Sequence, residues 1–504
     1  MKQLFLASTF FELVCLAAGI DSGVYDSTAA PALLGTDGVE SSDELTGGST
    51  DGGRAGDSSG AGDGSGNGSG SRERILLLSN NAAVLELTRP FATTPGADRL
   101  LARFDRVLDL NASVHPAHPS SWSPAHNDLP MVEAHLREKW GLGDDSIELV
   151  LESPQVNPAI ALGRVFSRAT IRVHADGLMS YGPTRNQIPL ANGQRMSTLH
   201  YLPLVPGLEP RLLAEFGIVP VPLAPEAFRA VVREVGEATA SELDEALDND
   251  LPDSPWAFAV GQYLAALGLI TGEEETALHV EMINEAAARG FSRVVFKPHP
   301  AAPPAQLEPL FDAAEKAGVE LSILDIPILA EVVIDRLRPG LIVGGFSTAL
   351  ATAREIYEVP ALTVGADMLL EAITPYQNSN RIPLTIIAEV CDGSAPVSHS
   401  SAEELSSLVA AVSYCMAPDV SRDLRGSAEA FLEQVFGGDD AAAAAGRFRR
   451  YFKRKRLTSL RLPGGNVDRF APRQLVRRTG TLAVLAARRQ QKRLATRSKS
   501  RRQH

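Results

Sequence analysis

Short apolar runs alternate with stretches typical of helices along most of the chain. In the first half the apolar runs are RILLLS, RVLDL, IELVLE and ATIRVHADG, and helices are expected between them at residues 90–104, 131–140 and 158–166. Short runs that alternate with helical segments predict parallel strands with helices on both faces of a sheet. The first half therefore predicts one doubly wound parallel-sheet domain.

The same alternation starts again after a Pro-rich, acidic stretch that ends in LDNDLPDSP, residues 247–255. The apolar runs are now WAFAVGQYL, RVVFKPHP, ELSILD, GLIVGG and ALTVG, with helices expected between them. We therefore predict an α/β protein with two Rossmann-like, doubly wound domains, residues 1–250 and 251–446. Ligands bind at the carboxyl ends of strands in such sheets, so two domains of this kind predict a site in the cleft that they face.

The first 23 residues, MKQLFLASTFFELVCLAAGIDSG, allow two interpretations. A lysine followed by an apolar run is typical of a secretion signal. The same stretch also divides into a strand, Gln3 to Ala7, and a helix, Thr9 to Gly19, and Glu12 interrupts the apolar run. The acid favours the first strand and helix of a domain, and hence a cytoplasmic protein. The three cysteines, odd in number and far apart, fit a reducing compartment.

Charge is distributed very unevenly along the 504 residues. The net charge is −13, but residues 447–504 hold 20 basic residues and one acid, a charge of +19, which leaves −32 for the rest. A basic tail of this kind can bind anionic lipid and hold the protein at the inner face of the plasma membrane. A solvated, disordered tail and a guide for an anionic acceptor chain are the alternatives. No nucleic-acid motif accompanies the charge, so no nucleic-acid partner is expected.

Two further segments change the picture only slightly. Residues 46–71 are rich in glycine and serine and are expected to form a flexible loop inside the first domain. Asp248 to Asp250, with the sequence DND, imitate a metal-binding DxD motif. They follow no strand, so a solvated linker is the preferred interpretation. No run of 18 apolar residues is present to span a bilayer.

Polar residues directly follow three of the expected strands. HADG ends a strand of the first domain, KPHP ends a strand of the second, and GGFST joins a strand to a helix with Ser347 at the N-cap. A helix N-terminus with free backbone N–H groups is a ready site for phosphate, and a nearby cation would complete it. Two other His-Pro pairs, at His115 and His118, have no such strand before them.

The order and spacing of these three sites resemble the bacterial sialyltransferases, in particular the α-2,8-polysialyltransferase family. Family members have two Rossmann-like domains in the GT-B arrangement and share a D/E-D/E-G motif, an H-P motif and an S-S/T motif. The matching residues are Ala175-Asp176-Gly177, His299-Pro300 and Ser347-Thr348. The resemblance covers the chain from Gln3 to about Gly437, without the Gly/Ser loop. Ala175 departs from the family pattern because it replaces the first acid.

The resemblance implies an inverting glycosyltransferase that moves sialic acid from CMP-sialic acid to a hydroxyl of a glycan acceptor. Asp176 is expected to accept the proton of that hydroxyl, and His299 to stabilise the departing CMP phosphate. The family works without a metal, so no metal or other cofactor is expected. The residues expected to bind the CMP donor are Lys297, Glu331, Ser347 and Thr348, and Gly177 and Gln262 are possible cleft residues.

Structural roles for the same residues stay open at this point. Asp176-Gly177 could be a turn that only ends a strand, and Ser347 could be an N-cap without a ligand. His299 could be a structural loop histidine, and Gln262 could serve packing or hydrogen bonding.

Two other classes of function also stay open. A CDP-alcohol phosphotransferase of the teichoic-acid type also combines a His-Pro pair with serines after a strand. A non-catalytic nucleotide-sugar-binding protein of envelope assembly is the other alternative, since Ala175 replaces a motif acid.

Overall fold

The structure, a computed structural model, describes residues 1–26, 72–81, 91–247, 255–299, 307–392, 401–437 and 446–466. The Gly/Ser-rich loop, Asp248 to Asp250, Pro300 and residues 467–504 of the basic tail lie outside these ranges. Packing divides the chain into two compact units. Unit 1 comprises Met1–Asp176, Asn186–Leu202 and Phe216–Thr239, and unit 2 comprises Gly177–Arg185, Pro203–Glu215 and the chain from Ala240 onward.

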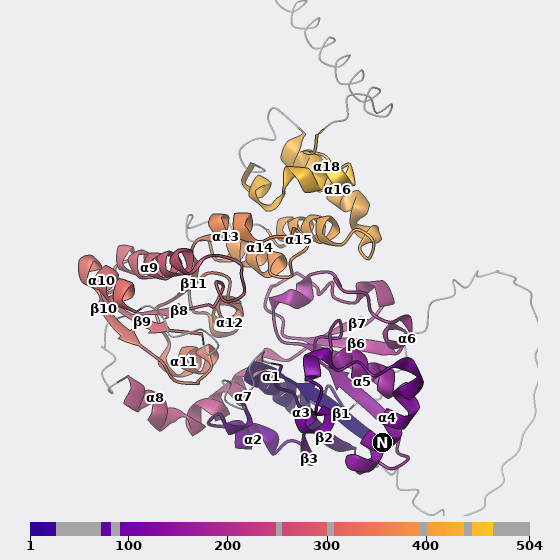
Figure 1. The fold of residues 1–504 in the computed structure, drawn as a ribbon. Helices are drawn as coiled ribbons and strands as arrows, with labels where there is room; N and C mark the ends of the chain where they lie inside the picture. The colour runs from indigo at the N-terminus through magenta and orange to yellow at the C-terminus, as the bar shows by residue number, and fades with distance from the viewer. Residues whose placement is uncertain are drawn as a thin grey trace, which may run out of the picture. The chain divides into compact units, whose positions relative to one another are not determined.

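Unit 1 is built on a parallel sheet of seven strands in the order β3-β2-β1-β4-β5-β6-β7 (Figure 1). Strand β1, in the interior of the sheet, carries Leu4, Phe5 and Leu6, all fully buried, so the N-terminal residues form the strand and helix predicted for a βα unit. The strands are β1 (Lys2–Ala7), β2 (Glu73–Leu78), β3 (Arg106–Asp109), β4 (Ile147–Leu151), β5 (Thr170–Ala175), β6 (Met196–Tyr201) and β7 (Val219–Pro222).

The helices of unit 1 connect these strands and cover the sheet. Helix α1 packs against α7, whose buried Phe228, Val231 and Val232 lie on one side of an otherwise polar helix. The helices are α1 (Phe10–Asp21), α2 (Ala97–Leu101), α3 (Leu110–Val114), α4 (Leu129–Lys139), α5 (Ala159–Val165), α6 (Leu190–Gly193) and α7 (Pro225–Ala238).

Unit 2 contains a second parallel sheet, of five strands in the order β10-β9-β8-β11-β12. The strands are β8 (Ala257–Val260), β9 (Arg293–Lys297), β10 (Glu320–Ile323), β11 (Leu341–Gly344) and β12 (Ala361–Thr363). Helices α9 (Gly272–Ala288) and α10 (Glu308–Ala317) pack together, as do α11 (Ala330–Leu337) and α12 (Thr348–Tyr357), and Figure 1 shows the two pairs on opposite faces of the sheet. The predicted α/β class with two doubly wound parallel sheets is confirmed.

The remaining helices of unit 2 follow its sheet, apart from α8, which precedes it. They are α8 (Ala240–Ala246), α13 (Ala366–Ala372), α14 (Arg381–Val390), α15 (Ala402–Met416), α16 (Arg425–Phe436) and α18 (Arg454–Leu460). No helix within the described ranges is both long enough and apolar enough to cross a bilayer.

The division into units differs from the boundary predicted near residue 250. Residues 177–185 and 203–215 belong to unit 2, because they pack against its later helices. The 3₁₀ helix Leu178–Tyr181 contacts α14, and Arg211 forms an ion pair with Asp423 at 2.6 Å. These contacts join segments that are far apart in the sequence, so no local sequence pattern could have predicted this division.

The beginning of the predicted basic tail is also part of unit 2. Phe448, Tyr451 and Phe452 are buried. Phe448 directly follows Arg447 and Tyr451 directly follows Arg450, and both arginines contact the body of the unit. Arg450 forms ion pairs with Asp367, Glu389 and Asp392, and Arg447 forms ion pairs with Glu389 and Glu404. A tail starting at Arg447 was therefore placed too early, since the described residues 446–466 are packed and partly neutralised.

Candidate functional site

The carboxyl ends of three neighbouring strands bring the predicted donor residues of unit 2 to one edge of its sheet. Lys297 at the end of β9 pairs in register with Val260 of β8, and Val260 pairs with Gly344 of β11. Gln262, His299 and Ser347 follow these strand ends directly. The strand order reverses between β8 and β11, and such a reversal is where ligands bind in open α/β sheets.

The connection from β11 to α12 is held close to Gln262. The backbone N–H of Phe346 donates to Gln262 Oε1 at 3.0 Å. A Cβ added to Gly345 would lie 2.5 Å from the same oxygen, so a larger residue there would displace the Gln262 amide from this hydrogen bond. Gln262 thus has the hydrogen-bonding role that the sequence left open, and it orients the loop that leads into α12.

Helix α12 starts at this loop with Ser347 as its N-cap. The Ser347 hydroxyl accepts the backbone N–H of Ala349 at 3.3 Å. Thr348 lies at the first position of the helix, and a Cβ added to Gly177 would lie 3.1 Å from its Oγ1. Gly177 of the first motif and Thr348 of the third therefore meet within unit 2. The N–H groups at this helix start carry partial positive charge and suit an anion.

Lys297 and His299 supply the positive and polar groups of this edge. Lys297 is 6% exposed and donates from Nζ to the carbonyl of Ile326 at 2.9 Å. Burial lowers the pKa of Lys297 to about 8, although Asp325 and Glu331 oppose the change, so the ammonium is still charged at pH 7. The buried Glu331 of α11 is thus close enough to Lys297 to influence its charge.

His299 stacks against Tyr263, with ring centroids 4.2 Å apart. Burial and then the Lys297 charge lower the pKa of His299 to about 4, so its imidazole is neutral at pH 7 without a ligand. A bound phosphate would favour the protonated form because opposite charges stabilise each other. The pair His299-Pro300 can be followed only to His299, since Pro300 lies outside the described residues.

Three carboxyl groups meet at the strand ends of unit 1. Asp176 follows β5, Glu152 follows β4, and Glu12 lies in the first turn of α1 directly after β1. The three strands are neighbours, since Phe5 pairs with Val150 and Leu151 with Val173. The sequence analysis did not select Glu12 and Glu152. The only signal for them was an acid inside, or just after, an apolar run.

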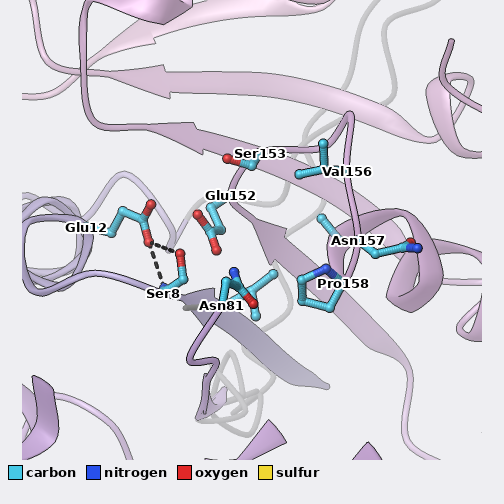
Figure 2. Close-up of a pocket in the computed structure, with 10 residues that line it drawn as sticks. Ser8, Glu12, Asn81, Glu152, Ser153, Val156, Asn157 and Pro158 are labelled. Carbon is cyan, nitrogen blue, oxygen red and sulfur yellow. Dashed lines mark hydrogen bonds between the residues drawn. The ribbon is translucent and has the colours of Figure 1, made fainter. Parts of the chain in front are cut away.

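A pocket of about 160 Å³ opens beside Glu12 and Glu152, at the reversal of strand order between β1 and β4. Figure 2 shows both carboxyl groups turned toward each other, close to Ser8. The residues that line the pocket are Leu6, Ser8, Glu12, Asn81, Glu152, Ser153, Val156, Asn157, Pro158 and Ala159.

Burial and the charge of Glu12 raise the pKa of Asp176 to about 7. A carboxyl group with this pKa is half ionised near neutral pH, which suits a general base. His174, two residues earlier, is buried, and its Nε2 lies 2.8 Å from the carbonyl oxygen of Leu6. Burial lowers the pKa of His174 to about 4, so this histidine is a neutral structural group.

Two parallel α/β units with polar groups at their strand ends are typical of proteins that bind nucleotides or nucleotide sugars. The sequence matches the family model described as "Alpha-2,8-polysialyltransferase (POLYST)" over residues 65–366, more than half of the chain. The protein is a glycosyltransferase. It belongs to the alpha-2,8-polysialyltransferase family, as the three motifs predicted. None of the curated proteins compared with the chain matches it.

Several solved structures resemble parts of the fold at low sequence identity. The GT-B domain of a sialyltransferase from Photobacterium damselae is 12% identical over 70% of this chain and 88% of its own, with a TM-score of 0.35. UDP-GlcNAc 2-epimerase from Methanocaldococcus jannaschii is 13% identical over 82% of this chain and 100% of its own, with a TM-score of 0.40. At TM-scores below 0.5, these likenesses contribute nothing to the assignment of family or activity.

Proposed function

We propose that the protein is an inverting sialyltransferase that uses CMP-sialic acid and a glycan hydroxyl. The acceptor oxygen forms a bond to the anomeric carbon of the sialic acid while the bond from that carbon to the CMP phosphate oxygen breaks on the opposite face. The electron pair of the broken bond leaves with the phosphate. Asp176 takes the proton of the acceptor hydroxyl. No step in this scheme needs a metal or a redox cofactor.

The observation that carries the proposal is the close approach of Gly177 to Thr348, where an added Cβ would lie 3.1 Å from Thr348 Oγ1, together with the family assignment. These residues are 171 positions apart in the chain, and Asp176 is the residue directly before Gly177. The pKa of Asp176, raised to about 7 by burial and by Glu12, supports its role as the base.

The polar edge of unit 2 supports the donor role. In the proposal, Ser347 and Thr348 donate to phosphate oxygens at the start of α12, and His299 stabilises the negative charge on the departing CMP. Lys297 contacts the nucleotide, and Glu331 accepts hydrogen bonds from the ribose. Gln262 acts indirectly, because its Oε1 holds the backbone of Phe346.

The test is turnover of two donors by the full chain. CMP-sialic acid labelled in the sugar and CDP-glycerol labelled in the glycerol are each incubated with a panel of glycan and polyol acceptors. We expect label on a glycan only from CMP-sialic acid, with inverted anomeric configuration by NMR. Transfer from CDP-glycerol alone would establish the phosphotransferase, and binding of CMP without any turnover would establish the non-catalytic protein.

We also propose that the protein binds the inner face of the plasma membrane through its basic C-terminal residues. Within 446–466, the exposed cations that form no ion pair with an acid of the described residues are Arg449, Arg454, Lys455 and Arg461. Each exposed cation near an anionic surface contributes roughly 1 kcal/mol. Co-sedimentation with phosphatidylserine vesicles should weaken when 467–504, which hold 12 of the 20 basic residues after 446, are deleted, and it should be lost at high salt. Binding of the shortened protein that survives high salt would refute this proposal.

A further inference from the structure

Glu12 and Glu152 form a carboxyl pair at the switch point of the unit 1 sheet. Their side chains are 7% and 5% exposed, respectively, and their carboxyl groups face each other (Figure 2). Such a contact between two carboxyl groups is favourable only when they share a proton, because two ionised carboxylates have only acceptor atoms. The pair therefore holds at least one proton while this contact exists.

The surroundings of the pair favour a single negative charge. Glu12 Oε2 accepts the backbone N–H groups of Ser8 and Thr9 at 2.7 and 3.1 Å, at the positive end of helix α1. These donors stabilise one ionised oxygen at one end of the pair. Two charges would repel each other at this short distance in a buried place.

No cation offsets that charge within the described part of the chain. Among the described residues, Glu12, Glu152 and Asp176 form no ion pair with a lysine, arginine or histidine, and Arg172 pairs with Glu148 at 2.9 Å. The two buried histidines of the neighbouring strands, His174 on β5 and His200 on β6, have pKa values lowered by burial to about 4 and about 3. Both histidines are therefore neutral at pH 7.

We propose that Glu12 and Glu152 share one proton and that the one negative charge they keep makes Asp176 a stronger base. This inference rests on the proposed function of Asp176 as the base. Both residues act through Asp176 and are positioning residues. The pocket beside them gives the pair access to solvent, so its proton equilibrates between turnovers.

The test compares single and double amide variants by their pH profiles. In Glu152→Gln the pair still carries one charge, on Glu12, so the acid limb of kcat/KM should move by less than about 0.3 pH unit. In Glu12→Gln/Glu152→Gln the charge is gone, so the limb should move down by roughly one pH unit or more. If the acid limb of kcat/KM keeps its wild-type position in the double variant, the proposal is overturned. A full shift already in Glu152→Gln would overturn it too, because Glu12 alone would then not keep the charge that acts on Asp176.

The matched control is Glu133→Gln/Glu138→Gln, which removes two acids from α4 of the same unit. Glu133 pairs with Arg137 and Glu138 is exposed, so the acid limb should keep its wild-type position. Glutamine at position 12 retains an oxygen that can accept the N–H groups of Ser8 and Thr9, which favours folding of the double variant.

A second measurement needs neither turnover nor the double variant. In protein labelled at the carboxyl carbons, NMR signals are assigned by their loss in Asp176→Asn and Glu152→Gln. We expect Asp176 to titrate near pH 7 and one proton to stay on the pair at that pH. Titration of Asp176 near its ordinary value would refute the inference even in a protein that transfers sialic acid. Conversely, the expected titration in a protein without transferase activity would refute only the proposed function.

Discussion

The strand ends of the two units have the same geometry and opposite chemistry. Each parallel sheet reverses its strand order once, between β1 and β4 in unit 1 and between β8 and β11 in unit 2. Unit 1 places carboxyl groups at this edge, and none of them forms an ion pair with a cation of the described residues. Unit 2 places a buried lysine, a histidine and the start of a capped helix there.

The difference teaches that the sheet supplies position and the loops supply charge. A carboxyl group kept from cations has its pKa raised and can accept a proton at neutral pH. A helix start beside a lysine favours an anion such as a phosphate. One type of fold, used twice, thus provides a proton acceptor in one unit and an anion site in the other, as the proposed sialyl transfer requires.

The largest expected effect comes from removing the base. Asp176→Asn keeps the shape of the side chain but removes its ability to accept a proton, so transfer should fall by a factor of roughly 10² to 10⁴. CMP affinity, measured by calorimetry, should be unchanged. The exposed Asp128→Asn serves as the control and should keep its activity. Near-normal turnover in Asp176→Asn would show that Asp176 is not the base, and the carboxyl groups of unit 1 would then have no assigned role in transfer.

A smaller effect is expected at the anion site. Ser347→Ala/Thr348→Ala removes two hydroxyl donors, and hydrogen bonds to charged groups contribute about 1.5–3 kcal/mol each, so CMP affinity should fall by at least about tenfold. Ser401→Ala in α15 loses a similar N-cap, which costs about 1 kcal/mol of stability, without touching the site. Unchanged CMP affinity in the folded double variant would place the phosphate elsewhere.

The pH dependence of transfer should report on unit 1. With the pKa of Asp176 at about 7, kcat/KM should fall about tenfold for each pH unit below 7. The same raised pKa stabilises the folded state most below about pH 4, and this contribution is lost as the pH rises through 7. A rate that is flat between pH 5 and 7 would contradict the assignment of the base.

The smallest effect is expected from deleting residues 467–504. If the anion affinity of unit 2 comes from its strand ends, this deletion should leave both CMP affinity and the melting temperature unchanged. Deleting from 447 should lower the melting temperature, because Phe448, Tyr451 and Phe452 are buried. A loss of CMP affinity in the shorter deletion would mean that the basic residues, and not the helix start, attract the nucleotide.

Much of the fold could be predicted because parallel strands buried on both faces are short, continuous apolar runs. The runs at RILLLS, IELVLE and RVVFK are strands β2, β4 and β9. Strands β6 and β7 were not predicted. The four residues of β7 are VPVP, and prolines obscure a strand that lies at the edge of the sheet, where they are tolerated.

The candidate site could be predicted only where a motif follows a strand. Lys297 ends β9, and His299, Ser347 and Thr348 follow strands at the same edge, where they were expected; their roles in binding stay predictions. Glu12 and Glu152 were missed because their importance comes from each other, and they are 140 positions apart. Pairing across neighbouring strands depends on strand order, which the sequence does not reveal.

Glu12 contributes both to the start of helix α1 and to the carboxyl pair with Glu152, so one substitution affects both. Its carboxylate accepts the N–H of Thr9 while the Thr9 hydroxyl accepts the N–H of Glu12, a reciprocal arrangement that starts helix α1. The same carboxylate forms half of the pair beside Asp176. In relatives without transferase activity, we expect substitutions to accumulate at position 152, whereas position 12 should remain glutamate because it stabilises the start of α1.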